Sequence, residues 1–329
     1  MNPKPNPKPT SKRRPYFHGP LYQRMTEDLH LTGKAPRTVS GYLRAVRQLT
    51  DYCQTTPDQI TEQQLRQFFL HLKNERHFAY GSLRVALSGV KFFYSVTCLR
   101  DWDVLSLLKL KNVSTLPEVL TRQQVRQIIN ATTTQRMNTF FWTVYSLGLR
   151  LNEALHLQTG DIDGGRMMVH IHRGKGAKDR YIPLPQTTLQ RLRNYWVTHR
   201  HPRLLFPADG RDHRLQTGNI AAIQTPMSET AVQGAIKQIT RAIDFGKKIS
   251  IHTLRHCYAT HLLEAGVSLK VIQQYLGHSS LTTTLIYLHL TDTATENARQ
   301  VIERMFHDSV DPACVDPDSI DPTNRPSGS

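Results

Sequence analysis

The sequence predicts a mainly α-helical protein of two domains, with a small β-hairpin in the second domain. The chain of 329 residues exceeds the usual size of a single domain, and each half is long enough to bury a hydrophobic core. Apolar residues recur at steps of three and four over most of the chain, which is the helical period. Strand-like runs occur around a basic turn, at residues 167–172 and 181–184.

Residues 16–110 are predicted to form the first domain, which is entirely helical. One amphipathic helix has Pro36 near its start and an apolar stripe of Val39, Leu43, Val46, Leu49 and Cys53. Thr61 and Gln64 form a capping box before a second helix, and a further stripe consists of Leu83, Leu87, Val90 and Tyr94. The basic residues suit a DNA-facing surface or a solvated helix face equally well: Lys34, Arg37, Arg44, Arg47, Arg84 and Lys91.

Residues 120–306 are predicted to form the second domain. Thr121 and Gln124 cap its first helix, and the basic turn at residues 174–179 connects the two strands of the hairpin. Further helices are expected to begin near Ser228, His252 and Ser268, and a last one to lie around Val301, Ile302 and Met305.

Three segments are predicted to lie outside the packed domains. Residues 1–15, rich in proline and lysine, form a disordered basic arm, and residues 111–119 form a linker. Residues 307–329, rich in aspartate and proline, form a disordered acidic tail.

The charge of the chain favours a polyanionic partner. Lysine and arginine number 42 against 26 acidic residues, which gives a net charge of +16. Because the acidic tail contributes −4, the rest of the chain carries +20. Such an excess attracts nucleic acid through phosphate contacts, although it also serves solubility or membrane association.

The four cysteines, Cys53, Cys98, Cys257 and Cys314, are far apart and form no C-x-x-C pair, so neither a disulfide framework nor a thiolate zinc site is expected. A signal peptide and a membrane span are not indicated, and a reducing cytoplasm fits the cysteine usage.

Three segments and one tyrosine carry residue types that suit chemistry at a phosphodiester. They are residues 148–153 (GLRLNE), 252–256 (HTLRH) and 276–278 (LGH), with Tyr287 nine residues later. Guanidinium groups bind phosphate oxygens through a planar fork and gain strength as negative charge develops on them, which makes Arg150 and Arg255 candidates for this role. His278 would donate to the same phosphate, and His252 would do likewise or assist proton movement.

This set resembles the signature of the phage integrase, or tyrosine recombinase, family: an Arg, an H-x-x-R pair, a His in an L-G-H turn, and a Tyr. The resemblance is strongest over residues 120–290 and weaker over residues 19–110, which look like the helical SAM-like core-binding domain of the family. It implies a two-domain recombinase architecture, with that helical domain followed by a mixed α/β catalytic domain.

The resemblance also implies a mechanism. Tyr287 would attack the phosphorus and form a 3′-phosphotyrosyl bond, and Lys175 in the hairpin would protonate the departing 5′ oxygen, with Lys178 as its rival. The bond energy is kept in the enzyme, so no metal, nucleotide or other cofactor is expected. The implied partners are double-stranded DNA sites and a homotetramer in the synaptic complex, and a monomer in solution is left open. The implied location is the cytoplasm of a bacterium, in contact with DNA.

The function predicted from this resemblance is site-specific integration or excision of a mobile element, since the sequence around residues 205–207 is similar to that of integron and transposon integrases. Alternatives are Xer-type resolution of chromosome or plasmid dimers, a silent DNA-binding regulator with the same fold, and a relaxing topoisomerase of the related tyrosine type.

Each candidate residue also has a plainer interpretation. Tyr287 sits among apolar residues typical of a core, and Arg150 with Glu153 could form a surface ion pair. Glu153 is otherwise expected to orient Arg150 or a backbone group. His252 and His256 have the spacing of a zinc pair, but Thr253 stands where a zinc protease has Glu, so no metal site is predicted. His256 is expected to be structural, with a supporting hydrogen bond near the phosphate as the alternative.

Overall fold

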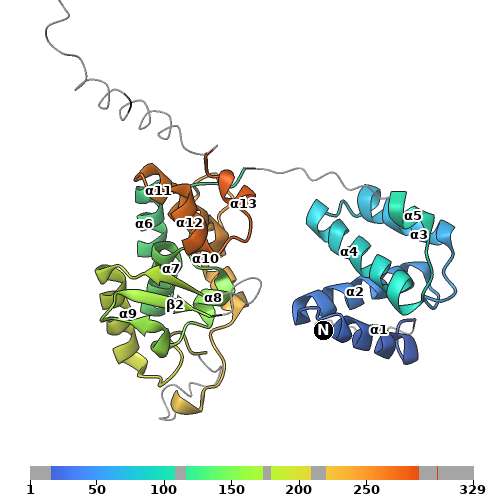
Figure 1. Cartoon of the computed structure of the whole chain (residues 1–329), viewed down its shortest axis with the longest axis horizontal. Helices are drawn as coiled ribbons and strands as arrows, with labels where there is room; N and C mark the ends of the chain where they lie inside the picture. The colour runs from blue at the N-terminus through green and yellow to red at the C-terminus, as the bar shows by residue number, and fades with distance from the viewer. Residues whose placement is uncertain (1–15, 108–115, 173–178, 209–219, 289–301, 303–329) are drawn as a thin grey trace, which may run out of the picture. The chain divides into compact units, whose positions relative to one another are not determined.

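The computed structural model describes residues 16–107, 116–172, 179–208, 220–288 and residue 302 (Figure 1). The chain divides into two compact units, residues 1–115 and residues 116–329, and each has a hydrophobic core of its own. The described part is mainly helical with one small antiparallel sheet, as the sequence predicts.

The first unit consists of packed helices. They are α1 (Pro20–Leu31), α2 (Pro36–Cys53), α3 (Glu62–Leu70), α4 (Tyr80–Phe92) and α5 (Asp103–Leu107), with π-helical turns η1 (His71–Glu75) and η2 (Phe93–Thr97). Pro20 and Pro36 stand at the first turns of their helices, where the missing N–H costs nothing. Gly89 allows α2 and α4 to approach closely, because a Cβ there would lie 2.8 Å from the Cα of Tyr42.

The second unit combines helices with a three-stranded sheet. Its helices are α6 (Arg122–Asn130), α7 (Gln135–Leu147), α8 (Leu151–Leu155), α9 (Gln186–His199), α10 (Glu229–Ile243), α11 (Ile251–Glu264), α12 (Leu269–Leu276) and α13 (Thr282–Leu285), with short 3₁₀ turns η3 (Thr159–Asp161) and η4 (Ile220–Ala222). The strands β1 (Ile162–Asp163), β2 (Met168–Ile171) and β3 (Arg180–Pro183) pair in that order, all antiparallel.

Helix α11 is central to the packing of the second unit. It lies against α7, where Phe140, Phe141 and Val144 are buried together with Leu254 and Cys257 of α11. In Figure 1, α11, α12 and α13 lie together at one end of the unit. This arrangement brings residues near 148, 252–256 and 276–287 to one region of the molecule.

Several local predictions are confirmed. Both capping boxes, at Thr61 and Thr121, are present, and Ser228 and Ser268 cap α10 and α12. The predicted hairpin strands correspond to β2 and β3, whereas β1 was not predicted. No helix in the described ranges combines the length and apolar character needed to cross a bilayer.

Some predictions concern residues outside the described part of the chain. These are the basic arm at 1–15, the hairpin tip with Lys175 and Lys178, most of the last helix near Val301, and the acidic tail at 307–329. The limits of the predicted linker, 111–119, likewise fall partly outside it.

Candidate active site

Arg150 is placed by a tight turn between α7 and α8. Gly148 ends α7 with φ of 60°, a left-handed conformation that glycine adopts without strain. A Cβ at Gly148 would lie 2.3 Å from Cδ1 of Tyr258, so a larger residue would also clash with α11. Leu149 is fully buried in the core, and Arg150 follows as the residue that precedes α8.

Helix α11 supplies His252, Arg255 and His256, whose spacing of three and four places them on one side of the helix. Arg255 is only 4% exposed. Its Nη1 donates to the carbonyl of Gly148 at 2.7 Å and its Nη2 to the carbonyl of Leu276 at 2.6 Å. Backbone carbonyls from two separate turns thus fix the orientation of this guanidinium.

The second arginine is held in the same way. Nη2 of Arg150 donates to the carbonyl of Gly277 at 2.9 Å, and Nη1 donates to Oε1 of Glu153 at 2.7 Å. Because Arg150 and Arg255 bond to the adjacent carbonyls of Gly277 and Leu276, the two cations are held side by side at the end of α12.

Five of the six predicted site residues line one cavity of about 230 Å³. The sixth, Lys175, lies outside the described residues. The cavity is lined by Arg150, His252, Arg255, His256, Gly277, His278, Ser279, Thr283, Ile286 and Tyr287. Side chains from the turn after α7, from α11, from the turn after α12 and from the residues after α13 therefore meet at one place, although 137 positions separate Arg150 from Tyr287 in the sequence.

Tyr287 lies two residues after α13 and is only 1% exposed. Its ring packs with Ala259, Ile272 and Leu276. Its hydroxyl lies 3.0 Å from Nδ1 of His256. Burial raises the pKa of Tyr287, and the positive charges of Arg255 and Arg150 oppose that rise.

His256 lines the cavity, and its Nδ1 contacts the tyrosine hydroxyl. The structural role and the alternative of a supporting hydrogen bond near the phosphate both stay predictions. The sequence around His256 could not predict this contact, because the contact depends on where the fold places Tyr287.

Burial favours the neutral form of the three histidines of the cavity. Burial lowers the pKa of His278 to about 4, assisted by the charges of Arg255 and Arg150. Burial and the neighbouring His252 and Arg255 lower the pKa of His256 to about 4 as well, and the pKa of His252 is lowered mainly by burial. The permanent positive charge at the cavity wall therefore comes from the two arginines.

Thr284 orients His278. The Oγ1 of this fully buried threonine lies 2.9 Å from Nδ1 of His278. If the hydroxyl donates to Nδ1, the neutral imidazole carries its proton on Nε2 and can donate a hydrogen bond from there.

Arg180 belongs to the same network, although the sequence analysis did not single it out. Its Nη1 and Nη2 donate to the two oxygens of Glu153 at 3.0 and 2.8 Å, and its Nε donates to the carbonyl of Tyr275 at 2.7 Å. Burial alone would raise the pKa of Glu153, but the hydrogen bond and charge of Arg180, with help from Arg150, lower it to about 2. Oε2 of Glu153 also accepts from the backbone N–H of Arg150 at 2.9 Å, which agrees with the orienting position expected for Glu153.

The chain matches two known protein families. Residues 118–294 match the phage integrase family, and residues 21–104 match the family described as phage integrase, N-terminal SAM-like domain. A Sinorhizobium fredii relative with the provisional name integrase/recombinase y4qK is 35% identical over 272 residues, which cover 82% of this chain and 84% of the relative. Tyrosine recombinase XerA of Thermococcus kodakarensis is 30% identical over 281 residues, which cover 84% of this chain and 92% of XerA.

A solved structure shares the fold. A lambda integrase dimer bound to a COC′ core site superposes with a TM-score of 0.64 at 16% identity, over 81% of this chain and 93% of that chain.

Proposed function

Because the chain belongs to the phage integrase family of tyrosine recombinases, which break and rejoin DNA, we propose that it integrates and excises a mobile element at specific DNA sites. One observation carries this proposal: two arginines, three histidines and Tyr287 line a single cavity. The partners that we propose are double-stranded recombination sites and, on paired sites, a homotetramer. We also keep the predicted domain limits, 16–110 and 120–306, as part of the proposal.

In this proposal the two arginines bind the phosphate that is cut. A phosphodiester carries one negative charge on its non-bridging oxygens, and attack on phosphorus increases the charge on them. Arg150 and Arg255 are held by backbone carbonyls before any ligand arrives, so they need not reorganise as that charge develops. His278, oriented by Thr284, donates a further hydrogen bond to the same group.

Tyr287 is the proposed nucleophile, and His256, which contacts its hydroxyl, is the proposed proton acceptor. The phenolic proton passes to Nδ1 of His256, 3.0 Å away, while the phenolic oxygen forms a bond to phosphorus. In the DNA-free protein this transfer is unfavourable, because the pKa of Tyr287 is raised and that of His256 is lowered to about 4. The negative charge of a bound diester favours the protonated imidazole, so proton transfer accompanies attack. His252, also at the cavity wall, remains the alternative acceptor.

The bond from phosphorus to the 5′ oxygen breaks as the tyrosyl bond forms. Lys175 gives a proton to that oxygen, and Lys178 is the alternative donor. The products are a 3′-phosphotyrosyl bond and a free 5′ hydroxyl. Attack by the 5′ hydroxyl of another strand reverses these steps and transfers the strand.

Replacement of Tyr287 with Phe tests the nucleophile. We expect Tyr287→Phe to bind a double-stranded site as wild type does but to form no covalent adduct with a suicide substrate that is nicked beside the cleavage point. The adduct is measured as a DNA band that resists denaturant and is removed by protease. Tyr195→Phe, which keeps a buried ring on α9, is the matched control and should form the adduct.

An adduct with Tyr287→Phe would show that another residue attacks. If the wild-type chain shifts DNA mobility but never traps the nicked substrate, the chain is a silent regulator and the proposed activity is wrong. Relaxation of supercoils on any sequence would instead indicate a topoisomerase.

Dimer resolution is the second candidate for the biological role, because tyrosine recombinase XerA is among the relatives of this chain. The test is to place the sequences that flank the gene on plasmids as direct and inverted repeats. Excision and inversion of these repeats support the mobile-element role. Recombination only at a site in the chromosome, away from the gene, would favour dimer resolution.

A further inference from the structure

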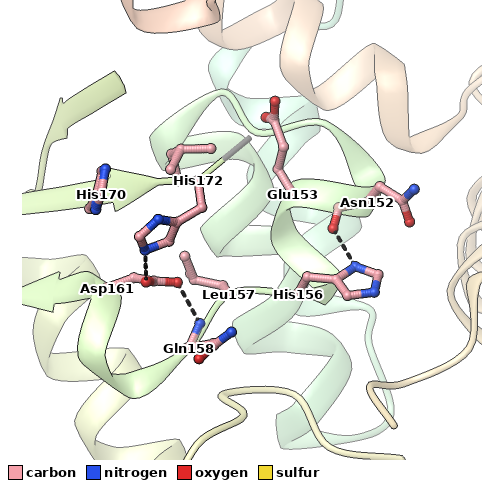
Figure 2. A pocket seen from close by; sticks show the side chains of 9 residues that line it. Asn152, Glu153, His156, Leu157, Gln158, Asp161, His170 and His172 are labelled. Atoms are coloured by element: carbon pink, nitrogen blue, oxygen red, sulfur yellow. Dashed lines mark hydrogen bonds and ion pairs between the residues drawn. The ribbon is translucent and has the colours of Figure 1, made fainter. Parts of the chain in front are cut away.

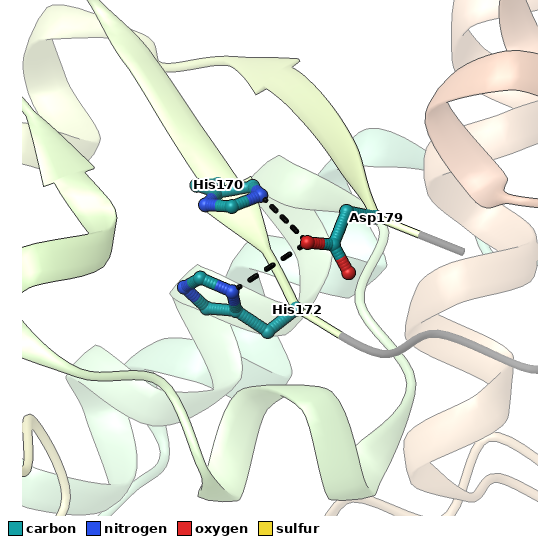
Figure 3. A group of neighbouring side chains, drawn as sticks. All are labelled: His170, His172 and Asp179. Atoms are coloured by element: carbon teal, nitrogen blue, oxygen red, sulfur yellow. Dashed lines mark ion pairs between the residues drawn. The ribbon is translucent and has the colours of Figure 1, made fainter. Parts of the chain in front are cut away.

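A second cluster of functional side chains lies on the hairpin, among residues that the proposed reaction does not use. His170 and His172 are two positions apart on and just after β2, so both project from the same face of the sheet. The register pairs Ile171 with Arg180, and one step further places Asp179 opposite His172. Figure 3 shows the two imidazoles and the carboxylate of Asp179 directed toward one another.

The distances in this cluster are close to those of a metal site. Oδ2 of Asp179 lies 3.3 Å from Nε2 of His170 and 3.8 Å from Nδ1 of His172. One ligand atom of each residue lies within 4.8 Å of the others. Ligands at about 2.0 to 2.1 Å from a tetrahedral Zn²⁺ are roughly 3.4 Å apart, so the ligand atoms that lie farthest apart need to approach by up to about 1.4 Å. The exposed side chains of His172 and Asp179 can make such an adjustment by rotating toward His170.

Asp161 provides independent support for a metal. Its Oδ1 lies 2.8 Å from Nε2 of His172 (Figure 2). The other ring nitrogen of His172, Nδ1, is the one that faces Asp179 (Figure 3). Asp161 is itself only 7% exposed, and its Oδ2 accepts from the backbone N–H of Gln158 at 2.8 Å. A buried carboxylate that receives the second N–H of a ligating histidine is the usual support of such ligands, because it fixes the tautomer and makes the imidazole more basic.

The cluster is also accessible. His170, His172 and Asp161 line a cavity of about 690 Å³, which gives an ion a path and room for a water ligand (Figure 2). The ring of His170 stacks on Tyr181, with ring centroids 4.5 Å apart and an interplanar angle of 9°, so its direction is fixed by packing.

We propose that His170, His172 and Asp179 bind a zinc ion, with Asp161 as the positioning residue of His172. Two imidazoles and one carboxylate, with water in the fourth position, form a ligand set suited to Zn²⁺ and to Co²⁺ as its spectroscopic substitute. The sequence analysis expected no metal for the reaction, and this site does not change that expectation, because its three ligands are not among the residues that line the phosphate cavity. The ion would instead join the ends of β2 and β3.

Cobalt titration of the untagged, full-length chain tests the proposal. After chelator has been removed by dialysis, we expect one equivalent of Co²⁺ to give visible absorption typical of tetrahedral coordination, and Zn²⁺ to abolish it. His172→Gln and Asp179→Asn should each weaken binding at least about tenfold, and Asp161→Asn about tenfold. The matched control is His156→Gln, because His156 is exposed, lines the same cavity and contacts the backbone carbonyl of Asn152.

Equal Co²⁺ binding by wild type, His172→Gln and Asp179→Asn would overturn the proposal, as would the absence of stoichiometric binding to wild type. In that case the cluster is a set of imidazole–carboxylate ion pairs only. Amide hydrogen exchange gives a second measurement. Zn²⁺ should slow exchange in residues 168–171 and 180–183 of wild type and of His156→Gln, and leave it unchanged in His172→Gln.

Discussion

His256 and His278 are partly buried and lie near Arg255. Burial and the positive charge of Arg255 both disfavour the protonated imidazole. In each case the pKa is lowered to about 4, from an ordinary value of 6.5. Folding therefore favours their neutral form. A bound phosphodiester would have the opposite effect, since its negative charge favours the protonated form.

The pH dependence of stability should reveal these histidines. Their contribution to the free energy of unfolding is fully favourable above pH 6.5 and is lost as the pH falls toward about 4, because the unfolded chain binds protons that the folded chain does not. We expect His278→Gln to reduce the slope of this loss by up to about 1.4 kcal/mol per pH unit. Urea denaturation of the DNA-free protein at several pH values measures the slope of the free energy of unfolding against pH.

The slope, not the absolute stability, is the quantity that matters in this experiment, because Gln can weaken packing at every pH. His156→Gln, at an exposed position, is the control. Parallel curves for wild type and His278→Gln would show that His278 takes up its proton equally in the folded and unfolded chains.

Arg180 shows why part of the site could not be predicted at the level of residues. Arg150, Arg255, His278 and Tyr287 belong to recognisable motifs. Arg180 belongs to none, and the predicted strand began one residue later, at Tyr181. In the structure Arg180 and Ile182 are buried while Tyr181 is 56% exposed. A buried arginine in a short strand is uncommon enough to indicate an ion pair, but only the fold identifies Glu153 as its partner.

At the scale of elements, the turn between α7 and α8 determines where the first arginine lies. Gly148→Ala should destabilise the chain through two effects: roughly 1 to 2 kcal/mol from a left-handed alanine, and about 1 to 3 kcal/mol more from the clash with Tyr258. It should also displace Arg150 and weaken DNA cleavage. The free energy of unfolding and the rate of adduct formation are the two measurements.

Gly266→Ala separates these effects. Gly266 has φ of +84°, and a Cβ there would meet nothing within 4 Å, so this variant has the backbone strain without the clash. We expect it to be less destabilised than Gly148→Ala and to cleave DNA as wild type does. Equal losses in the two variants would contradict the importance of the contact with Tyr258.

Elements with strong local signals were predicted well. Capping boxes at Thr61 and Thr121 depend on residues three positions apart, so the local sequence contains the information. Strand β1 has only the two residues Ile162–Asp163, which is too short for alternation to be visible, and it exists because β2 lies beside it. Such pairing depends on tertiary contacts.

At the scale of the whole molecule, the sequence predicted two domains, each with a hydrophobic core. Helical periodicity did not predict which segments of the second domain come together to form the cavity. The cavity combines residues from 150 to 287, and the family motifs linked them before any distance was known. Periodicity alone predicts helices in this region, without stating that α11 and α12 present their ends to the same space.

Charge is also a property of the whole molecule, and the acidic tail reduces it. Removal of residues 307–329 raises the net charge from +16 to +20. We expect the shortened chain to bind non-specific duplex DNA more tightly at low salt, with the difference shrinking as salt screens the tail. Fluorescence anisotropy at several salt concentrations measures both effects. Unchanged affinity at low salt would mean that the tail charge does not act on bound DNA.

The contacts of Glu153 form a mechanical connection across the second unit. This carboxylate is bonded to the guanidinium of Arg180 on β3 and to the backbone and side chain of Arg150. A displacement of β3 would therefore be transmitted through Glu153 to Arg150. In the proposed reaction, the hairpin strand and the arginine at the cut phosphate would then move together.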